Sequence, residues 1–123
     1  MSEENEVSAE AIVDHCMSAV PKALAAGVVD MARGRLLATR TAANELGEGP
    51  DQATPARLFE KARGVASAES RFEEILLSSN HQWQYFGRLK SSPQIVLVVY
   101  TRSDVNVGLM IGQCRAVAGK PWV

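Results

Sequence analysis

The stretch PQIVLVVYTRSDVNVGLMIGQCRAVA, residues 93–118, decides the fold of this chain. Its first half holds a run of aliphatic and aromatic residues, from Ile95 to Tyr100, without a polar break. A strand with one face in water would alternate between apolar and polar residues, so this run predicts a strand that is buried on both faces. Such a strand needs a partner on each side, and the rest of the chain must supply the sheet and the layers that cover it.

The second half of that stretch predicts a helix that lies on the sheet. Ser103 and Asp104 carry oxygens that can accept from the free backbone N–H groups at a helix start. The apolar residues that follow recur at spacings of three and four, so they share one helical face: Val107, Met110, Ile111, Cys114 and Val117. Gly119 is a candidate for a left-handed helix cap, and Pro121 cannot continue the helix.

The composition fits a single domain that does not bind nucleic acid. A chain of 123 residues with 46% hydrophobic residues can build one compact core. Thirteen basic and fourteen acidic residues give a net charge of −1. Because phosphate backbones are bound by strongly positive surfaces, this balance argues against a nucleic-acid partner. Arg33, Arg35 and Arg40 lie close together in the sequence, and we interpret them as exposed charges of a solvated hairpin.

Targeting and membrane segments are not predicted. The first residues, MSEENEVS, are acidic and polar, whereas a signal peptide begins with a basic region and an apolar run. A membrane-spanning helix needs about 20 apolar residues, far more than any run here. Cys16 and Cys114 are too few for a disulfide framework, and each falls in an apolar helical stripe. We therefore expect a cytoplasmic protein with free thiols and no membrane insertion.

The N-terminal half predicts a helix followed by a hairpin. We expect residues 1–7 to be a disordered arm and Ser8 to cap a helix that ends at Pro21. Segments 23–32 and 35–41 predict two strands, and Gly34 allows a turn with positive φ between them. The acidic segment 43–53 is interpreted as a surface loop. The domain would then cover residues 8–119, with a short tail at 120–123.

The middle of the chain leaves one ambiguity. Thr54-Pro55 predicts the start of a second helix, with a capping hydroxyl and a proline where no N–H is needed. Its apolar stripe is Leu58, Phe59, Ala62, Val65 and Ala66. Segment 69–80 fits either a continuing helix or a strand over 72–79, and periodicity leaves both open. Segment 81–89 alternates more clearly and predicts a strand that turns at Ser91-Ser92-Pro93.

The sequence contains no catalytic or metal-binding pattern. His15 and Cys16 are adjacent, but neighbours on a helix point about 100° apart and cannot act as base and nucleophile. His15, Cys16, His81 and Cys114 lack the short spacings of a zinc site. Glu73 and Glu74 would face opposite ways on a strand, so with Glu69 we interpret them as solubilising charges. We expect no metal and no enzyme activity.

Nucleotide and membrane motifs give the same result. The chain contains neither a P-loop nor a G-x-G-x-x-G motif, so we expect no nucleotide cofactor. Gly108 and Gly112 form G-x-x-x-G, which in a short soluble helix indicates close packing on the sheet. Trp83 and Tyr85 are interpreted as core or interface residues, because no basic field surrounds them. The pattern favours an interaction module.

The order of predicted elements, with the residues in them, resembles the roadblock/dynein light-chain family of profilin-like and longin-like domains. GVVDMARGRLLA (27–38) is similar to the first hairpin of that family. FEEILLSSNHQWQYFGRL (72–89) is similar to its third and fourth strands, and IVLVVYTRSDVNVGLMIGQCR (95–115) to its last strand and the start of its final helix. Bacterial Mgl-type regulators are most similar in strand and loop lengths, although the acidic loop at 43–53 departs from the pattern.

The resemblance implies an α/β (α+β) fold with the order α-β-β-α-β-β-β-α. A five-stranded antiparallel sheet would carry the first and last helices on one face and the second helix on the other. The resemblance also makes 72–79 a strand at an edge of the sheet and ends the second helix near Ala68.

The implied edge strand predicts a homodimer. Its side chains are too apolar for an edge in water, so we expect it to pair with its own copy across a two-fold axis, beside the paired second helices. The expected interface residues are Phe59, Phe72, Ile75, Leu76 and Leu77. The resemblance implies a non-catalytic regulator of a Ras-like small GTPase, contacted by Arg57, Lys61 and Arg63. The alternative is a dimeric scaffold or adaptor for a motor, kinase or membrane-associated complex.

Overall fold

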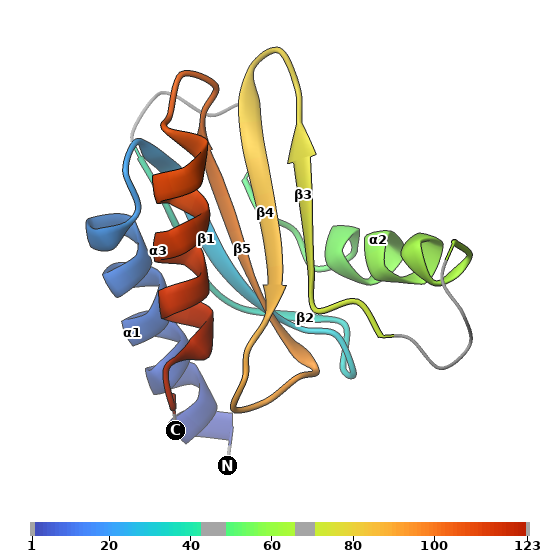
Figure 1. Ribbon diagram of the computed structural model, residues 1–123. Helices are drawn as coiled ribbons and strands as arrows, with labels where there is room; N and C mark the ends of the chain where they lie inside the picture. Colours follow the sequence, from blue (N-terminus) through green and yellow to red (C-terminus); the bar gives the residue numbers. More distant parts are fainter. Residues whose placement is uncertain (1, 43–48, 66–70, 123) are drawn as a thin grey trace.

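The computed structural model describes residues 2–42, 49–65 and 71–122 (Figure 1). Its described strands form one five-stranded antiparallel sheet in the order β2-β1-β5-β4-β3. The elements, in chain order, are α1 (Ser2–Ala19), β1 (Ala23–Asp30), β2 (Arg35–Thr41), α2 (Thr54–Arg63), β3 (Glu74–Ser78), β4 (Gln82–Arg88), β5 (Ile95–Arg102) and α3 (Val107–Gly119). The predicted element order and sheet are confirmed. None of the described helices is long and apolar enough to cross a bilayer.

Strand β5 lies at the centre of the sheet, as its unbroken apolar run predicts. It pairs with β1 on one side and β4 on the other. Residues Val96 to Tyr100 are at most 5% exposed. Leu97 and Val99 contribute to the core on one face, while Val96, Val98 and Tyr100 contribute to the core on the opposite face. Because both faces are dry, every position in the run must be apolar.

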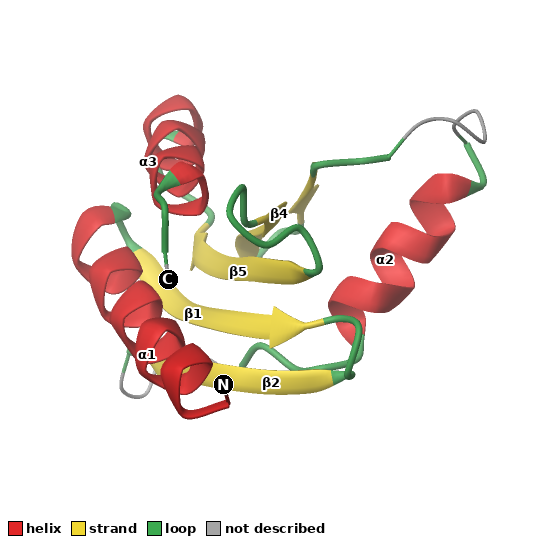
Figure 2. Cartoon of the chain, turned by 90° about the horizontal axis from the view of Figure 1, so that it is seen from below, coloured by secondary structure: helices red, strands yellow, loops and turns green. Residues whose placement is uncertain are grey.

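The helices cover both faces of the sheet. Figure 2 shows α1 and α3 on one side and α2 on the other. The core beneath α1 and α3 is the larger one and includes Cys16, Met110 and Cys114. The core on the α2 side is smaller, and α2 contributes buried Phe59 and half-buried Leu58 to it. The α/β (α+β) arrangement is therefore the predicted one.

The helix starts differ from those predicted. We expected residues 1–7 to be a disordered arm, but helix α1 begins at Ser2, so residues 2–7 are helical. The segment is rich in glutamate, which has a high helix propensity. At α2 the Thr54 hydroxyl does not cap; the Asp51 carboxylate accepts from the N–H groups of Ala53 and Thr54 at 2.8 and 2.7 Å. At α3 the cap is the side chain of Asn106.

Two other expectations are corrected. Gly108 and Gly112 do not bring α3 close to the sheet: both are exposed, and a Cβ added at Gly112 would meet nothing within 4 Å. Helix α3 ends on Lys120 in an extended conformation, not on a left-handed Gly119. Gly34 does adopt the expected positive φ, of 62°, in the β1–β2 turn. Helix α2 ends at Arg63 and is followed by a turn at Gly64 and Val65, so it does not extend to the expected end near Ala68.

Candidate interface at the free edge of the sheet

Within the predicted segment 72–79, Glu74–Ser78 form the edge strand β3, which pairs with β4 alone among the described strands (Figure 1). Ile75 lies opposite Phe86 and Leu77 opposite Gln84. At the two ends of this ladder the Arg88 N–H donates to the Glu73 carbonyl, and the Ser79 N–H donates to the Gln82 carbonyl. The helical alternative for this segment is therefore excluded.

The hydrogen-bond pattern of that ladder identifies which backbone groups face outward. In an antiparallel pair, hydrogen-bonded and non-hydrogen-bonded positions alternate. Since Glu73 and Ser79 bond to β4, the odd-numbered positions between them do so too. The N–H and C=O groups of Glu74, Leu76 and Ser78 therefore point away from β4, toward the free edge. This edge is able to accept a further antiparallel strand.

The side chains of β3 divide between the two faces of the sheet. Leu76 packs against the core beneath α1 and α3. Ile75 packs against the core on the α2 side, as does Phe72, which precedes the strand. Leu77 is 37% exposed, a high value for a leucine in a strand. Of the predicted interface residues, these four therefore lie at or near the edge.

Phe59, the fifth predicted interface residue, lies within the core of its own chain. Phe59 is 4% exposed and packs between α2, to which it belongs, and the sheet. Val65, which we expected on the inner stripe of that helix, is instead 85% exposed just after the helix ends. The apolar surface of the α2 region is thus provided by Val65 and not by the phenylalanine.

Glu74 holds the start of the edge strand to the rest of the fold. Its carboxylate accepts from the Tyr85 hydroxyl at 2.9 Å and from Arg115 Nε of α3 at 2.9 Å. The hydrogen bonds from Arg115 are the main reason why the pKa of Glu74 lies below its usual value. Glu73 pairs instead with Arg71 at 2.9 Å. The two adjacent carboxylates thus have separate partners, and Glu69 lies outside the described residues.

Arg88, which the sequence analysis did not single out, joins three segments behind the edge. Its Nε donates to the Phe72 carbonyl and its Nη1 to the Pro93 carbonyl, both at 2.8 Å. Its guanidinium lies 4.5 Å from the ring centroid of Phe59. Burial, followed by the charge of Arg71, lowers the pKa of Arg88. Alternate residues of a strand share a face, so Arg88 lies on the same face as buried Phe86, and an arginine on that face was the signal in the sequence.

The three predicted partner-binding residues all belong to α2, with Arg57 and Lys61 on one side of the helix and Arg63 on another. Arg57, Lys61 and Arg63 are all exposed. Arg63 forms an ion pair with Glu60 at 3.2 Å, with both side chains more than 70% exposed. Exposed pairs of this kind contribute little to stability, so these cations are available to a partner.

The candidate zinc ligands do not come together. Cys16 and Cys114 are both buried, and burial raises the pKa of the Cys16 thiol to about 12. His15 lies on the surface against Trp122, with ring centroids 6.0 Å apart, and His81 is exposed in the β3–β4 turn. Within residues 2–42, 49–65 and 71–122, no group of three or more His, Cys, Asp or Glu residues could hold a metal. These thiols are protonated core residues.

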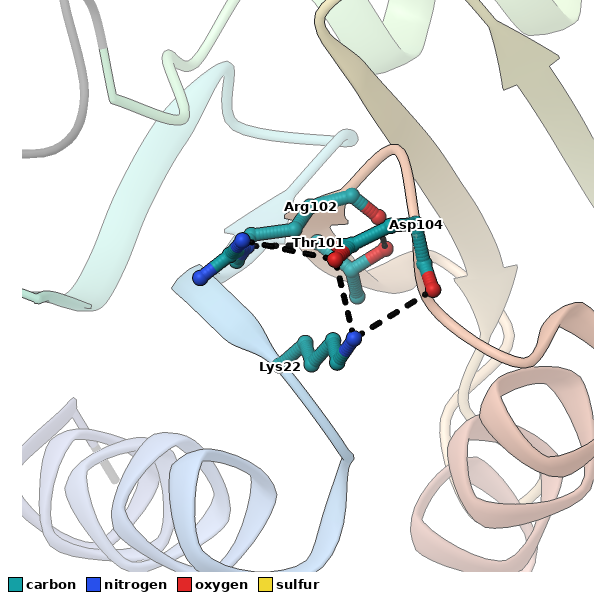
Figure 3. Close-up of polar contacts among 4 residues, drawn as sticks. All are labelled: Lys22, Thr101, Arg102 and Asp104. Atoms are coloured by element: carbon teal, nitrogen blue, oxygen red, sulfur yellow. Dashed lines mark hydrogen bonds and ion pairs between the residues drawn. The ribbon is translucent and has the colours of Figure 1, made fainter.

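Lys22, Arg102 and Asp104 form a polar contact at one end of the sheet, and its role is structural (Figure 3). The Lys22 ammonium lies 3.0 Å from Asp104 Oδ2, and Arg102 Nε lies 3.2 Å from Asp104 Oδ1. Lys22 adopts a positive φ of 54°. The contact joins the α1–β1 connection to the β5–α3 loop, far apart in the sequence. About half of each charged side chain is exposed, so its contribution to stability is small.

Comparison with solved structures identifies the fold. MglB from Myxococcus xanthus matches with a TM-score of 0.76 at 19% identity, over 96% of this chain and 87% of that chain. The gliding protein MglB from Thermus thermophilus matches with a TM-score of 0.71 at 18% identity, over 91% and 84%. A Roadblock/LC7 domain from Streptomyces avermitilis matches with a TM-score of 0.68 at 9% identity, over 89% and 90%. No family model and no curated protein matches the sequence.

The chain therefore has the roadblock/LC7 fold, as its sequence resemblance predicted. Within that fold it is similar in structure to Mgl proteins from two bacteria.

Proposed function

We propose that this chain is a non-catalytic homodimeric module that regulates a Ras-like small GTPase. The observation that carries the proposal is the free edge of β3, with outward backbone groups and apolar side chains on both faces. The shared fold with MglB supports it, and one MglB structure is described as having a tetrameric arrangement. The proposed role needs no reactive residue of its own.

The outward groups of β3 favour one register for the dimer. If a two-fold axis passes beside Leu76, Leu76 lies opposite its own copy and Glu74 lies opposite Ser78. Every outward N–H and C=O of these three residues then finds a partner. If the axis passed beside Ile75 or Leu77 instead, only two of these three residues would pair with residues of the second copy of β3. The Leu76-centred register is therefore the one we propose.

The proposed interface extends from the edge strand to α2. Phe72, Ile75, Leu76 and Leu77 would supply apolar area beside the new strand pair, at ~25 cal/mol per Å² buried. Phe59, on the buried side of α2, would hold that helix against the sheet. Val65, which is exposed just after α2, would pack near the second copy.

Contact with the GTPase is assigned to Arg57, Lys61 and Arg63. A regulator of this kind would hold the switch residues of the GTPase in place and contribute no arginine finger. The exposed cations on α2 would meet acidic groups of the GTPase and increase its rate of association. A dimeric scaffold or adaptor that touches no GTPase is the competing role.

A cross-linking experiment tests the dimer. Leu76→Cys should form an intermolecular disulfide under mild oxidation, because the two Cα atoms would lie about 5.5 Å apart in a hydrogen-bonded pair. Ser78→Cys is the matched control: it would lie opposite Glu74, too far from its own copy to cross-link. The native thiols are buried and should not interfere. A monomer by light scattering, or equal cross-linking of both variants, would contradict the proposal.

A hydrolysis assay then tests the GTPase. The dimer should accelerate GTP hydrolysis by a small GTPase encoded beside this chain by at least about tenfold. Replacing Arg57, Lys61 and Arg63 together by Gln should abolish the effect without altering the dimer, whereas Arg33→Gln should retain it. Unchanged hydrolysis in the presence of an intact dimer would favour the scaffold.

A further inference from the structure

A pocket of about 290 Å³ opens between the C-terminal half of α3 and the segments that flank β3 and β4. Arg71 and Glu73 line it from the chain before β3, and Arg88 and Lys90 line it from the end of β4 and just beyond. Arg115 lines it from α3. Ligand pockets commonly measure roughly 300 to 1,000 Å³, so this one suits a small molecule.

The charges that line this pocket are predominantly positive. Four cationic side chains face two carboxylates: Arg71, Arg88, Lys90 and Arg115 against Glu73 and Glu74. Both carboxylates are engaged, Glu74 by Arg115 and Tyr85, and Glu73 by Arg71. Among the described residues that line the pocket, positive charges therefore exceed negative ones by two, in a chain whose net charge is −1.

Arg88 and Lys90 carry this excess. The Nε and Nη1 groups of Arg88 donate to neutral backbone carbonyls, and no carboxylate of the described residues lies within ion-pair distance of it. Lys90 is exposed, and its ammonium has no partner within the described parts of the chain. Burial and the charge of Arg71 lower the pKa of Arg88, the charge of Glu73 raises it, and all three side chains line the same pocket.

The helix end beside the pocket does not cancel this field. A helix C-terminus carries partial negative charge on its free carbonyls. Here the Ala118 carbonyl accepts from the Lys90 N–H at 2.9 Å, and the Val117 carbonyl accepts from Trp122 Nε1 at 2.7 Å. Because these N–H groups cover two of the last carbonyls, the repulsion of an anion by those two groups is reduced.

We propose that this pocket binds a phosphate group, either as free phosphate or as the monoester of a small molecule. A phosphate carries a charge of about −1.5 to −2 at neutral pH and so balances the two excess positive charges. Its oxygens can accept from guanidinium and ammonium groups that approach from different segments. The inference does not depend on the dimer or on the GTPase, since each residue involved belongs to one chain.

Calorimetric titration with inorganic phosphate at constant ionic strength and a pH of about 8, where phosphate is dianionic, tests the site. We expect saturable binding with one site per chain. Lys90→Gln and Arg71→Gln should each weaken it by about threefold or more, and the double variant by about tenfold or more. Both side chains are exposed, so these variants should fold.

Arg33→Gln is the matched control: it removes one exposed cation that does not line the pocket. The proposal is wrong if this control weakens binding as much as the pocket variants, or if phosphate does not saturate the protein. Glycerol phosphate in a parallel titration separates the two sources. If glycerol phosphate binds more tightly than inorganic phosphate, the ligand is a monoester. If glycerol phosphate binds equally or more weakly, the ligand is free phosphate.

Discussion

The two edges of the sheet, β2 and β3, are built in opposite ways. Strand β2 ends in exposed, polar Thr39, Arg40 and Thr41, and its register with β1 shifts between Val28 and Val29. Strand β3 has a regular register with β4 and carries Ile75, Leu76 and Leu77 in succession. Charges and bulges protect a sheet edge from further pairing, whereas a regular apolar edge favours it. The comparison indicates that association should use β3 and spare β2.

Each edge is also held by an arginine, but in a different environment. Arg40 on β2 pairs with Glu10 and Asp14 of α1, at 2.6 and 2.8 Å, and all three side chains are about half exposed. Arg88 on β4, behind β3, is partly buried and bonds to backbone carbonyls. An exposed ion pair competes with water and salt, whereas a desolvated guanidinium leaves polar groups unsatisfied when it is removed. The β3 side therefore depends more strongly on its arginine.

The largest effect should come from Arg88→Gln. It should lower the free energy of unfolding by about 2 to 4 kcal/mol, because two charge-assisted hydrogen bonds and the contact with Phe59 are lost. Arg40→Gln on the opposite edge is the matched control and should cost much less. Urea denaturation followed by circular dichroism measures both. Equal losses would mean that burial does not distinguish the two arginines.

The next effect concerns association. Leu77→Lys places a charge on the apolar edge and should weaken the proposed dimer at least about a hundredfold. The monomer should remain folded, since Leu77 is already 37% exposed. Thr39→Lys adds the same charge to the β2 edge and should leave the dimer intact. Sedimentation equilibrium compares the two variants; dissociation by Thr39→Lys would assign the association to the wrong edge.

The smallest effect is a dependence of stability on pH at β3. The pKa of Glu74 is lower in the folded chain than its ordinary value of 4.5, mainly because Arg115 donates to it. The stabilisation is therefore fully present above 4.5 and is lost as the pH falls through the folded pKa. The free energy of unfolding should fall more steeply below about pH 5 in the natural chain than in Glu74→Gln. If the free energy of unfolding depends on pH in the same way in both proteins, the Glu74 carboxylate contributes nothing to this pH dependence.

The sequence by itself determined most of the elements and the centre of the sheet. The unbroken run from Ile95 to Tyr100 required burial on both faces, and β5 is the central strand. Gly34 allowed a turn with positive φ, and it adopts one. These features follow from local periodicity and backbone freedom, and both can be read directly from the sequence. Segment 72–79 needed the family resemblance, because over so few residues helix and strand periods overlap.

Only the tertiary structure decided how distant residues combine. Arg115 reaches Glu74, Lys22 reaches Asp104, and Arg88 joins Phe72, Pro93 and the ring of Phe59. The exposed glycines of α3, the Asp51 cap of α2 and the cationic pocket were likewise beyond the sequence. Periodicity states which face of an element is buried, but not what lies across from it. That depends on how the chain brings separate segments together.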